Sequence, residues 1–435
     1  MTKKFSAPRG TTDILPDGVP AWQNLEETAR RILKTYHYQE IRTPIFEDIN
    51  LFVRSLGEAT DVVNKQLFGV KSHEIETAEQ AAMPAEYHPY ALRPEGTASV
   101  VRSYLENSLD SKDQLSKLFY IGPMFRGERP QKGRLRQFHQ IGVEAIGPNN
   151  TSPYLDAEIL ALAMHLLKDF GVQGVKLKIN SLGSKEDKKI ISSLLREQFA
   201  KYKEALCEDC QSRFERNVFR VLDCKNEACR KVVNIAMGTD VHLPLSVESL
   251  QYFNNVQSAL KDLGIPYQVS RHLVRGLDYY THTVFEITAE GLGSQDAVGA
   301  GGRYDGLIHE LGGSPKIDYG AIGFALGIER ILLSKGNIIQ SPHRLNAFVV
   351  SVQPYEAFQL VHQLRQADIS ADMSFSPGSF KSQMGRANKL NTDYALILGE
   401  EELKNKTVAV KDMRNSTQEA VPLNNIIDYL RRALR

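Results

Sequence analysis

Cysteine is scarce in this sequence and confined to one short stretch. The 435 residues hold 4 cysteines, all between Cys207 and Cys229. A secreted domain stabilised by disulfides needs more cysteines, spread more widely along its chain. The scarcity therefore excludes a disulfide framework and leaves a metal site or reduced thiols as interpretations of the cluster.

Long hydrophobic runs and an excess of either charge sign are also missing. No segment approaches the roughly 18 apolar residues needed to cross a bilayer, and MTKKFSAPRG at the amino terminus has no apolar run behind its lysines. We therefore expect a cytoplasmic protein without a membrane segment. Lys and Arg number 53 against 52 Asp and Glu, so a site for a polyanion requires a local concentration of charge.

The composition is otherwise that of a globular protein, 42% hydrophobic and 24% charged, with a length that suits two or three domains. Apolar residues recur at helical spacing after Pro20, which predicts a helix near the amino terminus. Ser184 and Asp187 mark another helix start, and the charge-rich stretch after them predicts an inserted helical module at about 184–262. Further along, strands alternate with helical stripes, which predicts a separate α/β domain with a largely parallel sheet at about 343–435.

The densest positive charge lies in FRGERPQKGRLRQFHQIGVE, from Phe125 to Glu144. Short apolar stretches on both sides predict two antiparallel strands joined by this basic loop. Alternate residues of a strand share one face, so Gln140 and Glu144 point the same way, and Gly142 leaves a gap between them. We interpret this face as the floor of a pocket. A solvated arginine hairpin on a sheet edge is the alternative.

Four further stretches carry candidate ligand-binding groups. In LRPEGTASVVR, Pro94 and Gly96 fix a turn that exposes Glu95 to bind an ammonium group, although a helix N-cap explains the same residues. In GAIGFALGIERILL, Arg330 in the first helical turn after Gly327 can meet a phosphate or can simply be solvated. Two glycine-containing stretches, HLVRGLDYYTHTVFEI and GAGGRYDGL, match neither a Walker nor a Rossmann loop. The polar and aromatic residues near their glycines are Arg275, Asp278, Tyr279, Tyr280, Arg303 and Tyr304.

The cysteines follow the spacing C-x2-C-x13-C-x4-C, which corresponds to Cys207, Cys210, Cys224 and Cys229. Thiolate pairs at such spacing make tetrahedral zinc sites in small modules. The second gap is wider than is usual for a zinc ribbon, so a structural zinc ion and four reduced thiols both remain open.

Together these stretches resemble the histidyl-tRNA synthetase family over nearly the whole chain. PIFEDINLFVRSLGEATDVV is similar to the first class II motif, the basic hairpin to the second, and GAIGFALGIERILL to the third. LVRGLDYYTHTVFEI and GGRYDGL resemble the pair that sets the histidine enzymes apart from other class II synthetases. The last ninety or so residues, with SFKSQMGRANK and DYALILGEEEL, resemble the anticodon-binding domain shared with threonyl and prolyl enzymes.

The resemblance implies an α+β catalytic domain, a class II antiparallel sheet flanked by helices, built from residues 1–183 and 263–335. The helical insertion at 184–262 interrupts it, and an α/β anticodon-binding domain at 343–435 follows. The implied protein is a homodimer that uses ATP, Mg²⁺, L-histidine and tRNA(His). Histidine attacks the α-phosphorus of ATP to give histidyl-adenylate and pyrophosphate, and the histidyl group then passes to the tRNA with release of AMP.

The resemblance also implies roles at the phosphates. Arg126 and Arg275 are the expected catalytic residues, both at the α-phosphate, where Arg275 lies beside the substrate carboxylate and partly replaces a metal ion. Arg330 would hold the far end of the triphosphate, while Lys132 and Arg134 at the hairpin tip would meet the acceptor end of the tRNA. The expected ATP-binding residues are Arg126, Glu128, Arg134 and Arg330. In-line displacement at phosphorus mainly needs positioning and charge stabilisation, which such arginines supply.

For the amino acid, the resemblance gives the ammonium group to Glu95 and Gln140 and the imidazole to Glu144 and Tyr280. An imidazole both donates and accepts, so a site with buried partners for it rejects analogues strongly. The expected histidine-binding residues are Glu95, Gly96, Thr97, Arg126, Gln140, Glu144, Arg275, Tyr279 and Tyr280.

One stretch departs from the family, and two alternatives compete with it. KSHEIETAEQAAMPAEYHPY is longer and more acidic than the family's usual turn and borders the expected ammonium site. The first alternative is a non-catalytic, histidine-sensing regulatory subunit similar to that of ATP phosphoribosyltransferase. Such a subunit typically lacks the anticodon domain and the phosphate-binding arginines. In this sequence Arg126, Arg275 and Arg330 are all present, which disfavours it. The second alternative is another class II synthetase with the same carboxyl-terminal domain, and the stretches RGLDYY and GGRYDGL disfavour it.

Overall fold

The computed structural model divides the chain into two compact units, the first made of Met1–Leu15 and Ala21–Ile338 and the second of Ile339–Arg435 together with Pro16–Pro20. In the described ranges, no helix is long and apolar enough to cross a membrane. Most of the acidic stretch that borders the expected ammonium site falls at 71–89, outside the described residues. The structure describes residues 5–57, 60–70, 90–224, 226–237, 243–293, 296–336, 344–376 and 378–434.

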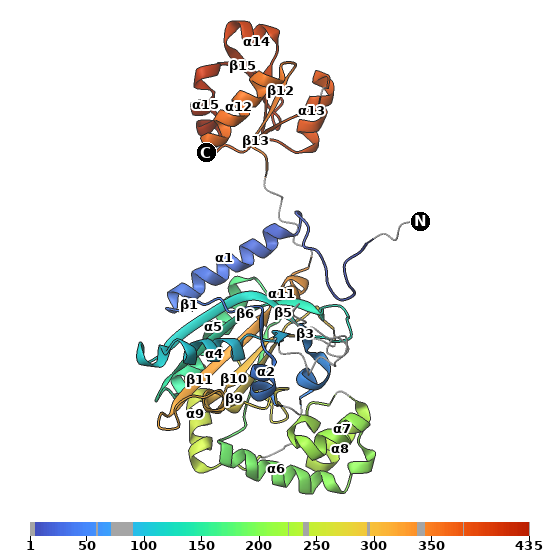
Figure 1. Cartoon of the computed structure of the whole chain (residues 1–435), viewed down its shortest axis with the longest axis vertical. Coiled ribbons are helices and arrows are strands. Elements are labelled where there is room, and N and C mark those ends of the chain that lie inside the picture. Colours follow the sequence, from blue (N-terminus) through green and yellow to red (C-terminus); the bar gives the residue numbers. More distant parts are fainter. Residues whose placement is uncertain are drawn as a thin grey trace, which may run out of the picture. The chain divides into compact units, whose positions relative to one another are not determined.

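An eight-stranded sheet forms the centre of the first unit (Figure 1). Its six central strands pair antiparallel, and the edge pairs β1–β5 and β7–β8 are parallel. The expected antiparallel sheet flanked by helices is confirmed. In spatial order the strands are β1 (Gln39–Glu40), β5 (Ser116–Phe125), β6 (Gln137–Pro148), β11 (Tyr319–Gly327), β10 (Ala297–Arg303), β9 (Thr281–Thr288), β7 (Lys176–Ser181) and β8 (Gln268–Val269).

The predicted basic hairpin is confirmed as β5 and β6, which pair with Tyr120 opposite Gly142. Gln140 lies between two glycines, Gly122 on β5 and Gly327 on β11. A Cβ on Gly122 would lie 2.7 Å from Arg93 Nη2, so Gly122 makes room for Arg93, whereas a Cβ on Gly327 would come no closer than 3.9 Å to Arg330.

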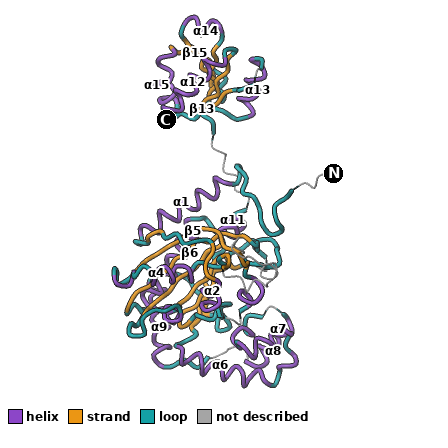
Figure 2. Tube along the Cα trace, in the orientation of Figure 1, coloured by secondary structure: helices purple, strands orange, loops and turns teal. Residues whose placement is uncertain are grey.

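Three long helices pack against the sheet: α1 (Val19–Thr35), α5 (Pro153–Asp169) and α9 (Val247–Asp262). Figure 2 shows the helices in purple and the strands in orange. The helix predicted after Pro20 is confirmed, and its buried residues Leu25, Ala29, Ile32 and Leu33 make the apolar stripe. These helices share one apolar core with strand residues Phe119, Ile141, Val143, Phe285 and Ile322.

A second apolar core lies under shorter elements that carry the site. They are helices α2 (Ile49–Leu56), α4 (Thr97–Glu106) and α10 (Asp305–Glu310), with a small sheet of β2 (Phe46–Asp48), β4 (Tyr90–Leu92) and β3 (Phe68–Val70). The π-helix η1 (Val62–Gln66) and the 3-10 helix η3 (Leu109–Ser111) complete this layer, and α11 (Ile328–Ser334) continues directly from β11.

The insertion begins at α6 (Lys185–Ala200), where the predicted capping box is present. Asp187 N donates to Ser184 Oγ at 3.1 Å, and Ser184 N donates to Asp187 Oδ2 at 3.0 Å. The boundaries at 183/184 and 262/263 stay predictions, and α9, although within the predicted insertion, packs against α5. The remaining elements are η4 (Lys203–Ala205), α7 (Glu208–Arg216), η5 (Val218–Val221) and α8 (Glu227–Met237).

The second unit is an α/β domain, but the expectation of a largely parallel sheet is wrong. Strand β12 pairs parallel with β13 and β14, whereas β14–β15 and β15–β16 are antiparallel. The six-residue helix before β15 and the short turn before β16 are too brief for parallel crossovers. The strands are β13 (Ala371–Met373), β12 (Ala347–Ser351), β14 (Tyr394–Leu398), β15 (Thr407–Asp412) and β16 (Gln418–Pro422), and the helices are α12 (Pro354–Gln366), α13 (Phe380–Lys389), α14 (Glu400–Asn405), η6 (Leu423–Asn425) and α15 (Ile426–Ala433).

Arg303 of the GGRYDGL stretch lies inside the first unit with no exposed surface. Its Nε and Nη2 donate to Asp156 Oδ1 at 3.0 and 2.6 Å, and Nη1 donates to Asp305 Oδ1 at 2.8 Å. A buried guanidinium requires such partners because its desolvation is costly. Arg303 therefore ties β10 to α5 and does not face a ligand.

Replacement of this arginine should destabilise the first unit. Arg303→Met leaves Asp156 and Asp305 without their cation, so we expect a loss of about 3–5 kcal/mol in the free energy of unfolding. Fluorescence of Trp22, the single tryptophan of the chain, follows urea unfolding of this unit. Arg31→Met, which removes an exposed ion pair with Asp169, is the control and should leave the midpoint nearly unchanged. Equal midpoints for both variants would contradict a structural role for Arg303.

Candidate active site

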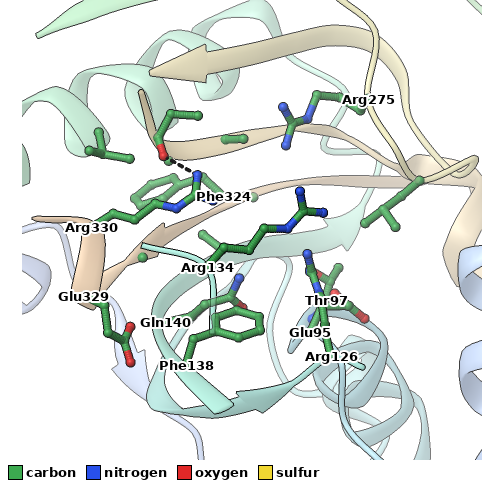
Figure 3. Close-up of a pocket in the computed structure, with 18 of the residues that line it drawn as sticks. Glu95, Thr97, Arg126, Arg134, Phe138, Gln140, Arg275, Phe324, Glu329 and Arg330 are labelled. Atoms are coloured by element: carbon green, nitrogen blue, oxygen red, sulfur yellow. Dashed lines mark hydrogen bonds between the residues drawn. The ribbon is translucent and has the colours of Figure 1, made fainter. Parts of the chain in front are cut away.

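A cavity of about 370 Å³ lies between the basic hairpin, strands β10 and β11 and the loop that carries Arg275 (Figure 3). Four guanidinium groups line it, two from the hairpin loop, one from the loop before β9 and one from α11. Burial lowers the pKa of three of them, Arg126, Arg134 and Arg330, and at least one neighbouring arginine lowers each further. The four arginines are Arg126, Arg134, Arg275 and Arg330. Four acidic side chains, Glu95, Glu128, Asp223 and Glu329, line the same cavity.

Backbone carbonyls hold two of these arginines in place. Arg126 Nε donates to Pro94 O at 2.9 Å. Arg330 Nε donates to Gly133 O at 2.9 Å and its Nη1 to Ala297 O at 2.7 Å. Neutral carbonyls fix the orientation of the guanidinium groups without cancelling their charge, so the groups remain able to bind an anion.

Arg275 and Gln140 each keep one polar atom without a partner. Arg275 Nη1 forms an ion pair with Glu286 Oε2 at 3.2 Å, but its Nε has no hydrogen-bond partner among the described residues. Gln140 Oε1 is likewise a buried acceptor without a described partner. Buried polar groups are normally paired, so these two atoms indicate where a ligand supplies an acceptor and a donor.

Glu95 satisfies both interpretations that its sequence allowed. Its carboxylate caps α4, accepting from Thr97 N at 2.7 Å and from Ala98 N at 2.9 Å. The same carboxylate lines the cavity. Burial raises its pKa, while these amide donors and nearby Arg126 oppose the rise. A carboxylate fixed in this way can receive a cationic group without moving.

Glu144 lies deeper, 1% exposed. Thr97 Oγ1 donates to its Oε1 at 2.8 Å, and the hydroxyl of Tyr304 donates to its Oε2 at 2.5 Å. Burial raises the pKa of Glu144 to about 8 despite these donors, and the negative charge of Glu95 adds to the rise. At neutral pH the carboxyl therefore holds a proton.

The gap expected beside Gly142 is filled, and this expectation is wrong. A Cβ on Gly142 would lie 2.0 Å from Tyr120 Cζ, and one on Gly96 would lie 2.2 Å from the same atom. Both glycines make room for the Tyr120 ring, whose position could not be read from strand parity alone.

Most residues predicted for the site meet at this cavity, namely Glu95, Thr97, Arg126, Glu128, Arg134, Gln140, Arg275, Tyr279, Tyr280 and Arg330. Gly96 and Glu144 are not among the lining residues, and Lys132 is exposed. Sequence reasoning missed Asp223 and Phe324 as lining residues. It also did not predict that Glu286 forms an ion pair with Arg275, although Glu286 lies in HLVRGLDYYTHTVFEI, a stretch with candidate ligand-binding groups.

Glu329 of α11 forms hydrogen bonds to His139 of the hairpin. Both of its oxygens accept from His139 N at 2.9 Å, and one lies 2.9 Å from His139 Nδ1. Glu329 lines the cavity beside Arg330, so this contact sets the distance between the hairpin and the helix start.

The four cysteines converge in the insertion. Their Sγ atoms all lie within 4.8 Å of one another, with Cys207 and Cys224 at 3.9 Å. Four thiolates around one zinc ion at Zn–S distances of ~2.3 Å would be separated by about 3.8 Å. The cluster therefore fits a tetrahedral metal.

The sequence matches two protein families. Residues 10–331 match the family described as histidyl-tRNA synthetase, and residues 346–433 match the anticodon binding domain. The chain is 44% identical to the histidine-tRNA ligase of Geobacillus sp. (strain WCH70), over 99% of each chain. It is 43% identical to that of Pelotomaculum thermopropionicum, over 98% of this chain and 97% of the relative. The chain belongs to the histidyl-tRNA synthetase family.

Solved structures agree with membership of the histidyl-tRNA synthetase family. Apo histidyl-tRNA synthetase of S. aureus is 35% identical, with a TM-score of 0.77 over 98% of this chain and 100% of that chain. A Bacillus halodurans protein described as an ATP phosphoribosyltransferase regulatory subunit/histidyl-tRNA synthetase has a TM-score of 0.62 at 21% identity, over 92% of this chain and 99% of that chain. That second likeness shows the fold alone.

The raised pKa of Glu144 predicts a pH dependence of stability. The folded protein keeps this proton up to about pH 8, whereas the unfolded chain releases it near 4.5, so the free energy of unfolding falls as pH rises between these values. Glu144→Gln removes this titration. From pH 5 to pH 8 we expect wild type to lose stability relative to the variant, by at most about 1.4 kcal/mol per pH unit. Urea unfolding followed by Trp22 fluorescence measures it, and parallel pH profiles would contradict the assignment.

Proposed function

We propose that the protein ligates L-histidine to tRNA(His), consuming ATP and releasing AMP and pyrophosphate through a histidyl-adenylate intermediate. The observation that carries this proposal is one cavity that combines four guanidinium groups with an acceptor, Gln140 Oε1, that has no hydrogen-bond partner among the described residues. The guanidinium groups suit a triphosphate, and the oxygen of Gln140 suits an ammonium group.

At the phosphates, the histidine carboxylate attacks the α-phosphorus, and pyrophosphate leaves in line with it. We assign Arg126 and Arg275 to the α-phosphate, where negative charge develops, with the free Nε of Arg275 as a donor. Arg134 and Arg330 are assigned to the far phosphates. The carboxylates of Glu128 and Glu329 line the same cavity and would hold Mg²⁺ brought with ATP, which neutralises the leaving pyrophosphate.

At the amino acid, Glu95 and Gln140 are assigned to the ammonium group, with Thr97 beside them. Glu95 offers a carboxylate that α4 fixes, and Gln140 offers its free oxygen. Two fixed acceptors hold the ammonium so that the carboxylate faces the phosphorus, which lowers the entropic part of the barrier.

The imidazole is assigned to Glu144 and Tyr280, with Tyr279 packed against them. A carboxyl with a pKa of about 8 and a neutral imidazole can share one proton between their facing atoms. An amino acid without a ring nitrogen leaves this buried carboxyl unpaired, which costs affinity. Thr97 and Tyr304, which line the cavity, hold this carboxyl in place by donating their hydroxyl groups to it.

The second step requires tRNA. The carboxyl-terminal unit belongs to the anticodon binding domain family, which supports tRNA as the partner. We assign the exposed Lys132 and the cavity-lining Arg134 to the acceptor end, since both lie at the hairpin tip. A cytoplasmic homodimer is the proposed working form, in line with the family resemblance.

We further propose that Cys207, Cys210, Cys224 and Cys229 hold one structural zinc ion. Buried Cys210 and Cys229 and partly exposed Cys207 and Cys224 supply an all-sulfur set of the kind zinc takes in structural sites.

A histidine-sensing regulatory subunit is the competing function. Full-length relatives at 42–44% identity are named histidine-tRNA ligase, and the four arginines that line the cavity support a role in phosphate binding. A sensor needs neither those arginines nor an anticodon domain. The ligase is therefore the better account.

The ligase predicts histidine-dependent exchange of labelled pyrophosphate into ATP. We expect exchange with histidine and at least about 10⁴-fold less with threonine or proline, because neither fills the imidazole site. Exchange absent with histidine, or equal with all three amino acids, would contradict the assignment.

Arg275→Ala separates transition-state stabilisation from ground-state binding. We expect a loss of about 10²–10³-fold in the rate of adenylate formation, since one charged donor to the developing charge is removed. The calorimetric affinity for histidine should change by less than about tenfold. Arg129→Ala, exposed in the same basic loop and outside the cavity lining, is the control and should keep the wild-type rate. Losses of equal size in rate and affinity would argue against the role.

A further inference from the structure

The cysteine cluster joins both ends of the segment that contacts the active site. Cys207 caps α7, Cys224 follows η5, and Cys229 lies on α8. Besides the sulfur contact to Cys224, Cys207 N donates to Cys229 Sγ at 3.2 Å. The cluster thus closes the chain over 207–229, and α7 and η5 lie within the closed loop.

The first contact, here called the α7 brace, supports Arg126. Arg213 and Arg220 both donate to Asp61 Oδ2, at 2.8 and 3.0 Å. Asp61 precedes η1, whose last residue Gln66 accepts from Gly127 N at 2.7 Å. Gly127 follows Arg126 in the chain. The α7 brace therefore transmits the position of the insertion to the strand end that carries a catalytic arginine.

The second contact, here called the η5 brace, supports the two tyrosines. Asn217 Nδ2 donates to Asp278 Oδ1 at 2.5 Å. Lys188 Nζ, which belongs to α6 and lies outside the closed loop, also donates to the backbone oxygens of Asp278 and Tyr280, at 2.9 and 2.8 Å, and supports the same loop separately from the η5 brace. The η5 brace fixes the loop from which Tyr279 and Tyr280 enter the cavity.

Apolar packing and the chain itself also link the segment 207–229 to the active site. Val218, Phe219 and Val221 of η5 belong to the same buried core as Tyr279 and Tyr280. Asp223, the residue before Cys224, itself lines the cavity. One ligand of the cluster is thus adjacent in sequence to the wall of the active site.

We propose that the zinc ion held by the four thiolates sets both braces, so that substrate binding and turnover depend on a zinc ion whose four ligands lie outside the cavity lining. This inference rests on the proposed ligase function and zinc site. Zinc–thiolate coordination supplies much of the free energy that folds small modules. Four reduced thiols form only weak hydrogen bonds, so without the ion the loop 207–229 opens locally and releases the residues it holds. Asp61 and Asn217 act as positioning residues.

The test uses the full chain as purified, chelator-treated, and reloaded with ZnCl₂. Metal analysis should find about one zinc per chain. Hydrogen exchange should rise in residues 60–67 and 276–282 on zinc removal and return on reloading, while the carboxyl-terminal unit stays unchanged as an internal control. In the pyrophosphate exchange assay, zinc removal should raise KM for histidine and lower kcat, each by about tenfold, the effect of a lost charged hydrogen bond.

Two variants test the braces with zinc in place. Asp61→Asn should lower kcat more than it raises KM, because the α7 brace serves Arg126. Asn217→Ala should mainly raise KM for histidine, because the η5 brace serves the tyrosines. Ser212→Ala, exposed on α7, is the matched control and should behave as wild type.

The outcomes separate the claims. Protein that neither retains nor takes up zinc overturns the proposed site. Zinc that can be removed with no change in exchange, KM or kcat, or brace variants identical to Ser212→Ala, overturns the coupling. Failure of the ligase itself differs from both, because the zinc-loaded protein would then show no histidine-dependent exchange.

Discussion

The pairing of Tyr120 with Gly142 in the β5–β6 hairpin determines where the groups of the site lie. A slip of one residue would turn Gln140 and Glu144 toward the apolar core under α1 and bring Ile141 to the cavity. The Tyr120 ring resists such a slip, because it occupies the space where a side chain at residue 142 would be. The packing of Tyr120 against Gly142 therefore also fixes the positions of Gln140 and Glu144.

Around that hairpin the fold gathers four arginines and four acidic side chains at one cavity. Burial lowers the pKa of Arg126 and Arg330, yet Pro94, Gly133 and Ala297 hold these side chains toward the cavity through backbone carbonyls. Groups fixed in advance need no reorganisation when charge develops on a phosphate. The contacts of α11 and of the insertion serve the same end, since each fixes a backbone segment beside an arginine or a tyrosine.

Local patterns predicted much of this from sequence. Alternation gave the hairpin, helical spacing gave α1, and the Ser184 capping box gave the start of α6, because each is decided by residues close in the chain. The convergence of arginines from three distant stretches came from family resemblance. Long-range packing escaped prediction: the Tyr120 ring beside Gly142, the burial of Arg303, and the antiparallel half of the second sheet. Each depends on which elements meet, which spacing along one strand or helix does not encode.

The central claim is that one cavity binds the amino acid through Gln140 and Glu144 and the phosphate through Arg126 and Arg275. A crystal structure with a non-hydrolysable histidyl-adenylate analogue tests it most directly. The account predicts the ammonium group within hydrogen-bonding distance of Gln140 Oε1, the imidazole at Glu144, and the phosphate mimic at Arg126 and Arg275. An analogue bound with its imidazole among the arginines, or outside this cavity, would contradict it.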